Sequence, residues 1–158
     1  MQARNKAMSY TFDIVDIEPV VLAVAQARFM RSEVSSKLLS LFDIAYSWLK
    51  TSSVKQAGHN YAIYDQCTAD QMRVQAGFPV SDHFPDCESV KCVQLKSGRA
   101  VHVKHIGPYG KLQAAYNGLH EWCAREGYKT SGESWEIYGD WNDDPSQLVT
   151  DIYFRVAE

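Results

Sequence analysis

A glutamate set among aromatic residues is the part of this sequence that could do chemistry. In the segment 134–138, Glu136 directly follows Trp135 and stands two residues before Tyr138. Alternate side chains of a strand point to opposite faces, so Glu136 and Tyr138 share one face while Trp135 and Ile137 share the other. A carboxylate held beside an aromatic ring is a receptor for a cation. The segment therefore predicts an acidic ligand contact at Glu136.

A second interpretation of Glu136 is purely structural. Arg73, Lys104 and Arg155 are predicted on other strands, and an ion pair with one of them would give the carboxylate a local electrostatic role only. The ligand role is favoured, because a carboxylate among aromatic side chains is typical of functional sites.

Length, composition and charge indicate one soluble domain. The chain has 158 residues, 46% of them hydrophobic and 22% charged, with a net charge of -3. Acids and bases are mixed, with no basic cluster, so direct nucleic-acid binding is not expected. No apolar run reaches membrane-spanning length and no secretory signal is visible, so we expect a cytoplasmic protein without a membrane partner. Residues 1–9 are predicted to be a disordered tail, and 10–158 a single domain.

The cysteines and histidines predict neither a disulfide framework nor a metal site, and no cofactor is expected. The four cysteines include no C-x-x-C pair, which favours reduced thiols. The set His83, Cys87, Cys92 and His102 matches no standard zinc spacing. His102 and His105 should point to opposite faces of one strand, so only one of them can face a groove.

Hydrophobic periodicity predicts eight strands and two helices. Val34, Leu38, Leu41 and Phe42 begin an apolar helical stripe with Ser32 as its cap, and a second helix follows 107–110 and ends at Gly127. The expected strands are 11–17, 20–25, 61–65, 72–80, 89–95, 99–106, 133–140 and 148–156. The strands 89–95 and 99–106 are predicted to form a hairpin around the turn 96–98.

The order of these elements repeats, which predicts an α+β fold. Residues of about 20–80 and 99–156 each give strand, helix, strand, strand, and Ala62 in the first unit aligns with Glu136 in the second. We expect the two units to combine into a mainly antiparallel sheet with both helices on one face. The other sheet face and the seam between the units are then the expected place for a central ligand groove.

Several aromatic residues are candidates for contact with a ligand in that groove. Tyr64 aligns with Tyr138, so the two tyrosines can face each other across the seam, although cross-strand packing explains them equally well. Phe78 and Phe84 flank the irregular stretch between the units, where a lid can form. Tyr153, on the last predicted strand, is a further candidate contact. Trp135 is expected to face the helices and to be core, like the tryptophans on the helical stripes.

Five short motifs in the second half together resemble the GyrI-like effector-binding family. They are, in order, the segments 105–109, 126–128, 135–138, 144–145 and 150–153. The family includes the DNA gyrase inhibitory protein and the drug-binding domains of bacterial multidrug regulators. The resemblance covers roughly residues 10–157.

The resemblance implies two repeats around a groove that takes up flat, apolar, often cationic molecules. The acidic ligand contact of the family corresponds to Glu136, and its motif at the strand-to-helix corner places Tyr109 near the groove. Some relatives are hydrolases of strained, DNA-alkylating natural products. No helix-turn-helix segment precedes Tyr10 in this sequence, so the stand-alone form is expected.

The sequence and the resemblance are consistent with three functions. The first is binding of apolar aromatic compounds, cationic ones included, for sequestration or sensing of a drug or toxin. The second is a hydrolase of reactive electrophilic aromatic toxins, in which Glu136 activates water with help from Tyr138, Asp151 or Tyr153. The third is a protein-interaction module that inhibits a partner such as DNA gyrase.

Overall fold

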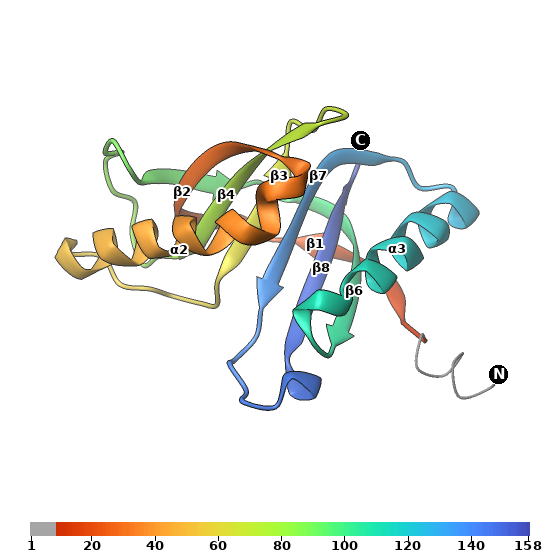
Figure 1. Ribbon diagram of the computed structural model, residues 1–158. Helices are drawn as coiled ribbons and strands as arrows, with labels where there is room; N and C mark the ends of the chain where they lie inside the picture. The colour runs from red at the N-terminus through yellow and green to blue at the C-terminus, as the bar shows by residue number, and fades with distance from the viewer. Residues whose placement is uncertain (1–8) are drawn as a thin grey trace.

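The computed structural model describes residues 9–158, which form one eight-stranded antiparallel sheet and two α-helices (Figure 1). The predicted tail therefore lies outside the described residues, apart from Ser9. The strands are β1 (Phe12–Ile17), β2 (Val20–Met30), β3 (Tyr61–Asp65), β4 (Gln71–Pro79), β5 (Lys91–Leu95), β6 (Gly98–Ile106), β7 (Thr130–Tyr138) and β8 (Val149–Val156). The helices are α2 (Val34–Thr51) and α3 (Gln113–Glu126), and short 3-10 turns lie at η1 (Arg31–Glu33), η2 (Tyr109–Lys111) and η3 (Pro145–Gln147).

The sheet order places the two strand-helix-strand-strand units side by side. The order is β1-β6-β8-β7-β3-β4-β2-β5, and the seam between the units is the pair β7–β3. At this seam Ala62 is the direct partner of Glu136, as their alignment in sequence suggested. The strand before each unit pairs with the other unit, β1 with β6 and β5 with β2.

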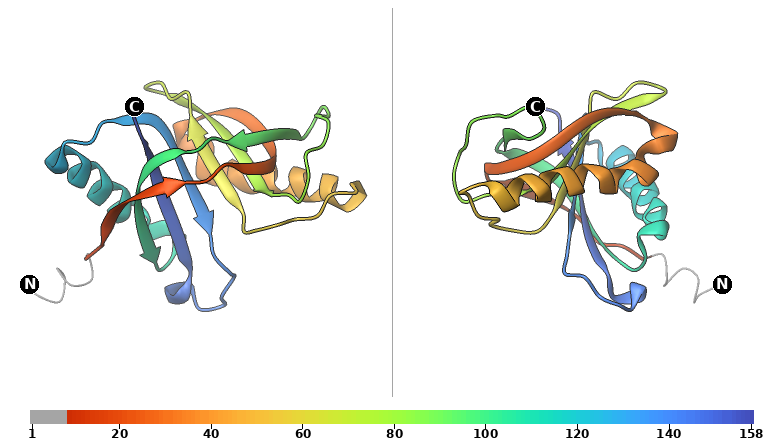
Figure 2. Two further views of the ribbon diagram at one scale, coloured as in Figure 1. Left: turned by 180° about the vertical axis from the view of Figure 1, so that it is seen from behind. Right: turned by 60° about the vertical axis from the view of Figure 1, so that its left-hand side comes forward.

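The predicted hairpin between 89–95 and 99–106 is wrong, because β5 and β6 lie far apart in the sheet order. β5 pairs with β2, whereas β6 pairs with β1 and β8. Short links nevertheless join β1 to β2 and β5 to β6, so strands from distant places in the order are held close together and the sheet curls (Figure 2). Gly77 permits this curvature, since a Cβ there would lie 1.8 Å from the carbonyl oxygen of Ala23.

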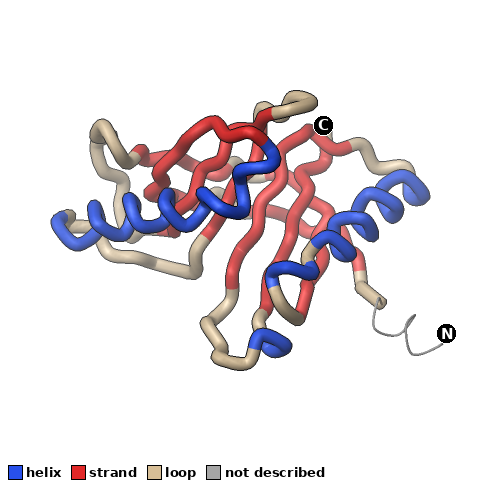
Figure 3. The backbone as a smooth tube through the Cα atoms, in the orientation of Figure 1, coloured by secondary structure: helices blue, strands red, loops and turns tan. Residues whose placement is uncertain are grey.

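Both helices cover one face of the sheet, which we call the helix face (Figure 3). Ala62, Glu136 and Ile152 are successive register partners across β3, β7 and β8, so they share this face. Ala62 packs in the cluster under α2 and Ile152 in the cluster under α3. The register thus places Glu136 between the two helices.

The opposite face, which we call the back face, has a core of its own. Ile63, Trp135 and Tyr153 are register partners there, and Trp135 is 1% exposed. The curled sheet packs them with Leu22, Val24, Tyr61, Leu95 and Ala100. The expectation that Trp135 faces the helices is therefore wrong, because the curl packs this part of the back face with apolar side chains.

The helices form where the apolar periodicity indicated. Leu41, Phe42 and Ala45 bury one side of α2 against β2 and β4. Gly127 ends α3 in the left-handed conformation with φ 79°, which glycine adopts without strain. The predicted cap Ser32 instead lies inside the turn Arg31–Glu33.

Membrane insertion by a helix finds no support in the fold. Across residues 9–158, neither helix has the length and apolar character needed to span a bilayer.

Candidate functional site

A cavity of about 1000 Å³ lies on the helix face. One wall comes from α2, and the opposite wall comes from the start of the second helical segment, where Tyr109 and Leu112 lie. The floor is formed by β3 and the end of β7. Because α2 and α3 cover different halves of the sheet, the seam between them is left without a helix above it (Figure 1). The seam is thus where the fold leaves room for a ligand.

Glu136 lies at the floor of this cavity and is held by three tyrosines. Its carboxylate is buried, with 6% of the residue exposed. Oε1 accepts hydrogen bonds from the hydroxyls of Tyr138 and Tyr64, the latter at 3.4 Å, and Oε2 accepts one from the hydroxyl of Tyr116. The donors come from β7, β3 and α3, so both halves of the chain contribute to one carboxylate site.

The three phenols are fixed as donors by their surroundings. Burial, and then the nearby charge of Glu136, raises the pKa of Tyr116 and of Tyr138 well above its ordinary value. The same two causes raise the pKa of Tyr64. The hydroxyls therefore remain protonated at neutral pH and donate to the carboxylate.

The charge of the Glu136 carboxylate is not cancelled by a base. Among residues 9–158, the ion pairs of Lys, Arg and His all involve other carboxylates, and none reaches Glu136. The structural interpretation, in which Arg73, Lys104 or Arg155 pairs with Glu136, is wrong, because these three bases contact Asp65, Asp151 and Glu133. A buried carboxylate held only by neutral donors attracts a cation that enters the cavity.

Apolar and aromatic side chains form the rest of the cavity wall. The ring of Tyr138 lies edge-on to Phe42 at 6.1 Å and to Tyr109 at 5.6 Å between ring centroids. Leu38 and Tyr46 from α2 extend this wall. Flat apolar molecules match such a lining, since aromatic rings pack well in edge-to-face and offset arrangements.

The mouth of the cavity carries exposed apolar residues. Leu39 is 70% exposed and Trp141 is 71% exposed, and both line the opening. His59 and Asp140 also line it and contact each other, with 2.8 Å between Nε2 and Oδ1. Trp141 follows the end of β7 and forms part of the rim of this opening.

A second cavity, of about 570 Å³, borders Glu136 from the side of α3. Tyr116, His120 and Phe154 line it, whereas Arg31, Val34, Tyr64 and Glu136 line both cavities. The carboxylate and its tyrosines therefore form a partition between two spaces on the helix face.

The structure brings four of the sequence-predicted contacts together at the larger cavity, namely Glu136, Tyr138, Tyr64 and Tyr109. It places the other three elsewhere. Tyr153 lies on the back face, stacked on Trp135 at 5.3 Å, because it follows Ile152 on an alternating strand. Phe78 is fully buried beneath Tyr46, and Phe84 packs on Trp48, so neither lines the cavity between the helices.

The two histidines of β6 have separate surroundings. His105 is buried on the helix face, where its ring nitrogens contact the hydroxyl of Tyr10 and the carbonyl oxygen of Pro108. His102 lies on the back face between Asp13 and Asp151, at 3.0 and 2.7 Å. Neither histidine is at the cavity. Within the described part of the chain, no group of three or more metal-ligating side chains is assembled.

Sequence reasoning missed Tyr116 as a partner of Glu136. The residue lies on the apolar stripe of α3 with Ala115 and Leu119, a position typical of core side chains. A tyrosine on a stripe that faces the sheet needs a partner for its hydroxyl, and this requirement was the available signal. The wall residues of α2 carry no such signal, since an apolar stripe looks the same over a cavity and over a core.

A comparison with protein families gives this geometry a context. The family model of the GyrI-like small molecule binding domain matches residues 40–157, which is most of the chain. The chain therefore belongs to the GyrI-like small molecule binding domain family. Among curated proteins, no sequence matches it significantly.

Solved structures share the fold. The C-terminal domain of EcmrR superposes with a TM-score of 0.79 at 21% identity, covering 94% of this chain and 98% of that domain. In the EcmrR–DNA complex the TM-score is 0.81 at 22% identity, covering 99% of this chain and 61% of the EcmrR chain, so this chain spans about three fifths of that relative.

Two further relatives are more distant in sequence. SAV2435 bound to tetraphenylphosphonium gives a TM-score of 0.71 at 12% identity, covering 93% of this chain and 94% of that one. A hydrolase from Listeria innocua gives 0.62 at 12% identity, covering 99% and 97%. At these identities the likeness establishes the fold alone.

Proposed function

We propose that the chain binds apolar, aromatic, cationic small molecules in the helix-face cavity, with Glu136 as the acidic contact. The observation that carries this proposal is a buried carboxylate held by three tyrosines, with no basic partner among residues 9–158, at the floor of an aromatic cavity of about 1000 Å³. Such a site suits a ligand whose positive charge is spread over flat apolar groups. Sequestration or sensing of drugs or toxins is the role that follows.

The aromatic wall and the carboxylate contribute differently to binding: the wall to affinity, and Glu136 to selectivity for charge. Phe42, Leu38 and Tyr109 offer apolar area to any aromatic ligand, whatever its charge. Glu136 adds attraction only for a cation and repulsion for an anion, and burial strengthens both effects. Charge selectivity is therefore the property that measures the contribution of Glu136 to binding separately from that of the aromatic wall.

Tetraphenylphosphonium and tetraphenylborate test this property, because they have nearly the same shape and opposite charge. Calorimetric titration should show saturable 1:1 binding of the cation and much weaker binding of the anion. In Glu136→Gln, which keeps the size and loses the charge, the cation should bind about 10- to 100-fold more weakly. Equal affinity for the two ions, or an unchanged affinity in Glu136→Gln, would contradict the proposal.

A second candidate function, hydrolysis of electrophilic aromatic toxins, is favoured by one contact. Tyr138 and Tyr116 both reach the carboxylate, so an acid or base partner stands beside Glu136, as a proton transfer requires. Asp151 and Tyr153, the other predicted partners, line the back face and are removed from this scheme. Incubation with an electrophilic aromatic toxin and mass spectrometry of the small molecule decides: turnover beyond one equivalent supports hydrolysis, and stoichiometric protection supports binding alone.

A further inference from the structure

A polar cavity of about 580 Å³ lies on the back face, separate from the helix-face site. Its floor is formed by Ile63 and Gln75, which are register partners on β3 and β4. The turn between β5 and β6 and the end of β8 enclose it. The volume is within the range of small-molecule sites.

Gln75 is the side chain in this cavity that has no structural explanation. The residue is 6% exposed, on a strand with neighbours on both sides. Its amide makes no hydrogen bond with any residue of the range 9–158, whereas buried amides in proteins are almost always paired. Among residues 9–158, Thr150 Oγ1 is the one side-chain nitrogen or oxygen atom that has neither a hydrogen-bond partner nor contact with solvent. The amide of Gln75 also lacks a partner but is not sealed from solvent in this way, so it is open to the cavity.

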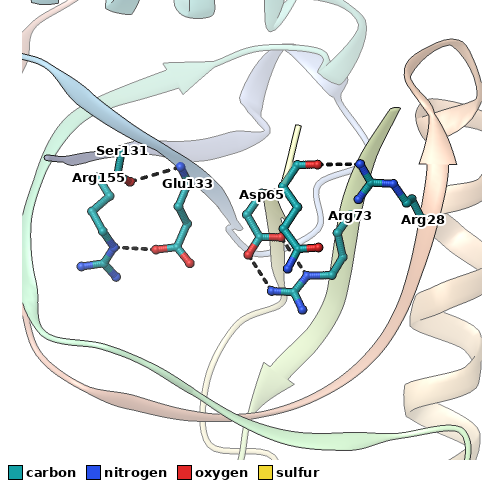
Figure 4. Close-up of polar contacts among 7 residues, drawn as sticks. Arg28, Asp65, Arg73, Ser131, Glu133 and Arg155 are labelled. Atoms are coloured by element: carbon teal, nitrogen blue, oxygen red, sulfur yellow. Dashed lines mark hydrogen bonds and ion pairs between the residues drawn. The ribbon is translucent and has the colours of Figure 1, made fainter. Parts of the chain in front are cut away.

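Two of the arginines around the cavity are held by carboxylates (Figure 4). Arg73 donates to both oxygens of Asp65, at 2.8 and 2.7 Å. Arg155 donates to Glu133 and also to the carbonyl oxygens of Ser97 and Lys96. These pairs leave no free guanidinium for an anion and neither of these two carboxylates free for a cation. Lys96 and Glu158 also line the cavity, but both are exposed, so solvent screens their charges. The buried polar group without a protein partner is thus a neutral amide, which favours a neutral ligand.

An amide offers a donor and an acceptor side by side, and this determines the complementary edge. Glutamine pairs in this bidentate way with the amino group and ring nitrogen of adenine, and equally with a primary carboxamide. Ile63, Val93 and Leu95 supply apolar walls on which an uncharged ring can pack. A buried polar group built for such an edge discriminates strongly against an analogue that lacks the donor.

We propose that this back-face cavity is a second ligand site, which binds uncharged heteroaromatic molecules through an N–H donor and an adjacent acceptor paired with the amide of Gln75. Adenine-type heterocycles are the best match. The site is independent of the helix-face cavity, since the two lie on opposite faces of the sheet, so failure of either proposal leaves the other standing.

Nuclear magnetic resonance of the whole chain tests the proposal with two purines. 9-Methyladenine, whose N–H donors are those of the amino group, should shift the side-chain amide signal of Gln75 in a saturable way, whereas 6-dimethylamino-9-methylpurine, which has no N–H donor, should not. This comparison needs no variant. Equal shifts with both purines, or with neither, would overturn the proposal.

Two substitutions at the same residue complete the test. Gln75→Leu removes donor and acceptor without adding charge, and Gln75→Glu removes the donor and adds a negative charge; each should weaken adenine binding at least about tenfold. Gln147→Leu, at an exposed residue outside this cavity, is the matched control and should bind adenine like the wild type. Cooperative unfolding in urea shows that the variants are folded. Unchanged adenine affinity in a folded Gln75→Leu would refute the assignment.

Discussion

The two faces of β7 differ in what lies above them, although their residues alternate in one short segment. Trp135 points to the back face, where the curled sheet packs apolar side chains closely around it. Glu136 points to the helix face, where two helices over different halves leave the seam uncovered. A sheet face that folds onto itself becomes core, whereas a face covered by two separate helices keeps room for a ligand. The same strand thus contributes to the core on one side and to the proposed ligand site on the other.

The largest expected effect comes from removing the side chain of Trp135 from the core of the back face. Trp135→Ala removes a side chain that is 1% exposed, and we expect a loss of about 3–5 kcal/mol in the free energy of unfolding, measured with urea. Because Trp135 does not line the helix-face cavity, the dissociation constant for tetraphenylphosphonium should stay within about threefold under conditions where the variant is folded. If Trp135→Ala lost tetraphenylphosphonium binding but kept its stability, the assignment of the back face to the core and of the helix face to the ligand site would be wrong.

A smaller effect is expected from the tyrosines of the helix face. Tyr138→Phe removes a donor to a buried carboxylate and should cost about 1.5–3 kcal/mol of stability, the usual worth of a hydrogen bond to a charged group. Tyr109→Phe is the control, because the hydroxyl of Tyr109 has no hydrogen bond to Glu136 and its ring alone packs on Tyr138. If both variants lose the same stability, the donor role of Tyr138 is wrong.

His102 gives the back face a dependence on pH. Its hydrogen bond to Asp151 raises its pKa, and that to Asp13 adds to the effect, against the opposing effect of burial. A pKa raised by folding contributes stability that is fully present below the unfolded pKa of about 6.5 and is lost as pH rises through the folded pKa. Unfolding by urea at a series of pH values should show this loss in the wild type and not in His102→Gln. A loss of equal size in both proteins would mean that other groups titrate.

The smallest effect concerns Arg31, one of the four residues that line both helix-face cavities. Arg31 is exposed and donates to the carbonyl oxygen of Thr68, so solvent screens its charge. Removing this positive charge in Arg31→Gln should strengthen tetraphenylphosphonium binding about two- to fivefold and weaken tetraphenylborate binding in turn. Equal changes for both ions would point to packing and not to charge.

The sequence allowed the elements to be predicted because their signals are local. Alternation along 133–140 and the helical stripe from Val34 are present in neighbouring residues, and the repeat aligned Ala62 with Glu136, which the structure shows to be register partners. Strand partners are not local: the turn 96–98 looks like a hairpin, but β5 and β6 find better partners elsewhere in the sheet. Alternation separates Trp135 from Glu136 but does not say which of them faces the helices, since both faces are apolar.

The site was predictable to the same extent. Glu136, Tyr64, Tyr109 and Tyr138 followed from the segment, the repeat and the family resemblance. Tyr116 was missed because it comes from α3, and its approach to the carboxylate depends on how that helix lies on the sheet. The back-face cavity could not be predicted either. Whether the amide of Gln75 finds a hydrogen-bond partner depends on how the strands pack, and the sequence does not show this.

The most direct measurement is a crystal structure of the chain with tetraphenylphosphonium. We expect the ligand between α2 and α3, with phenyl groups against Phe42 and Tyr138 and the phosphorus atom nearer to Glu136 than to any other carboxylate, since the cation is attracted to the buried charge. Density for the ligand on the back face, or in the cavity but turned away from Glu136, would contradict the account.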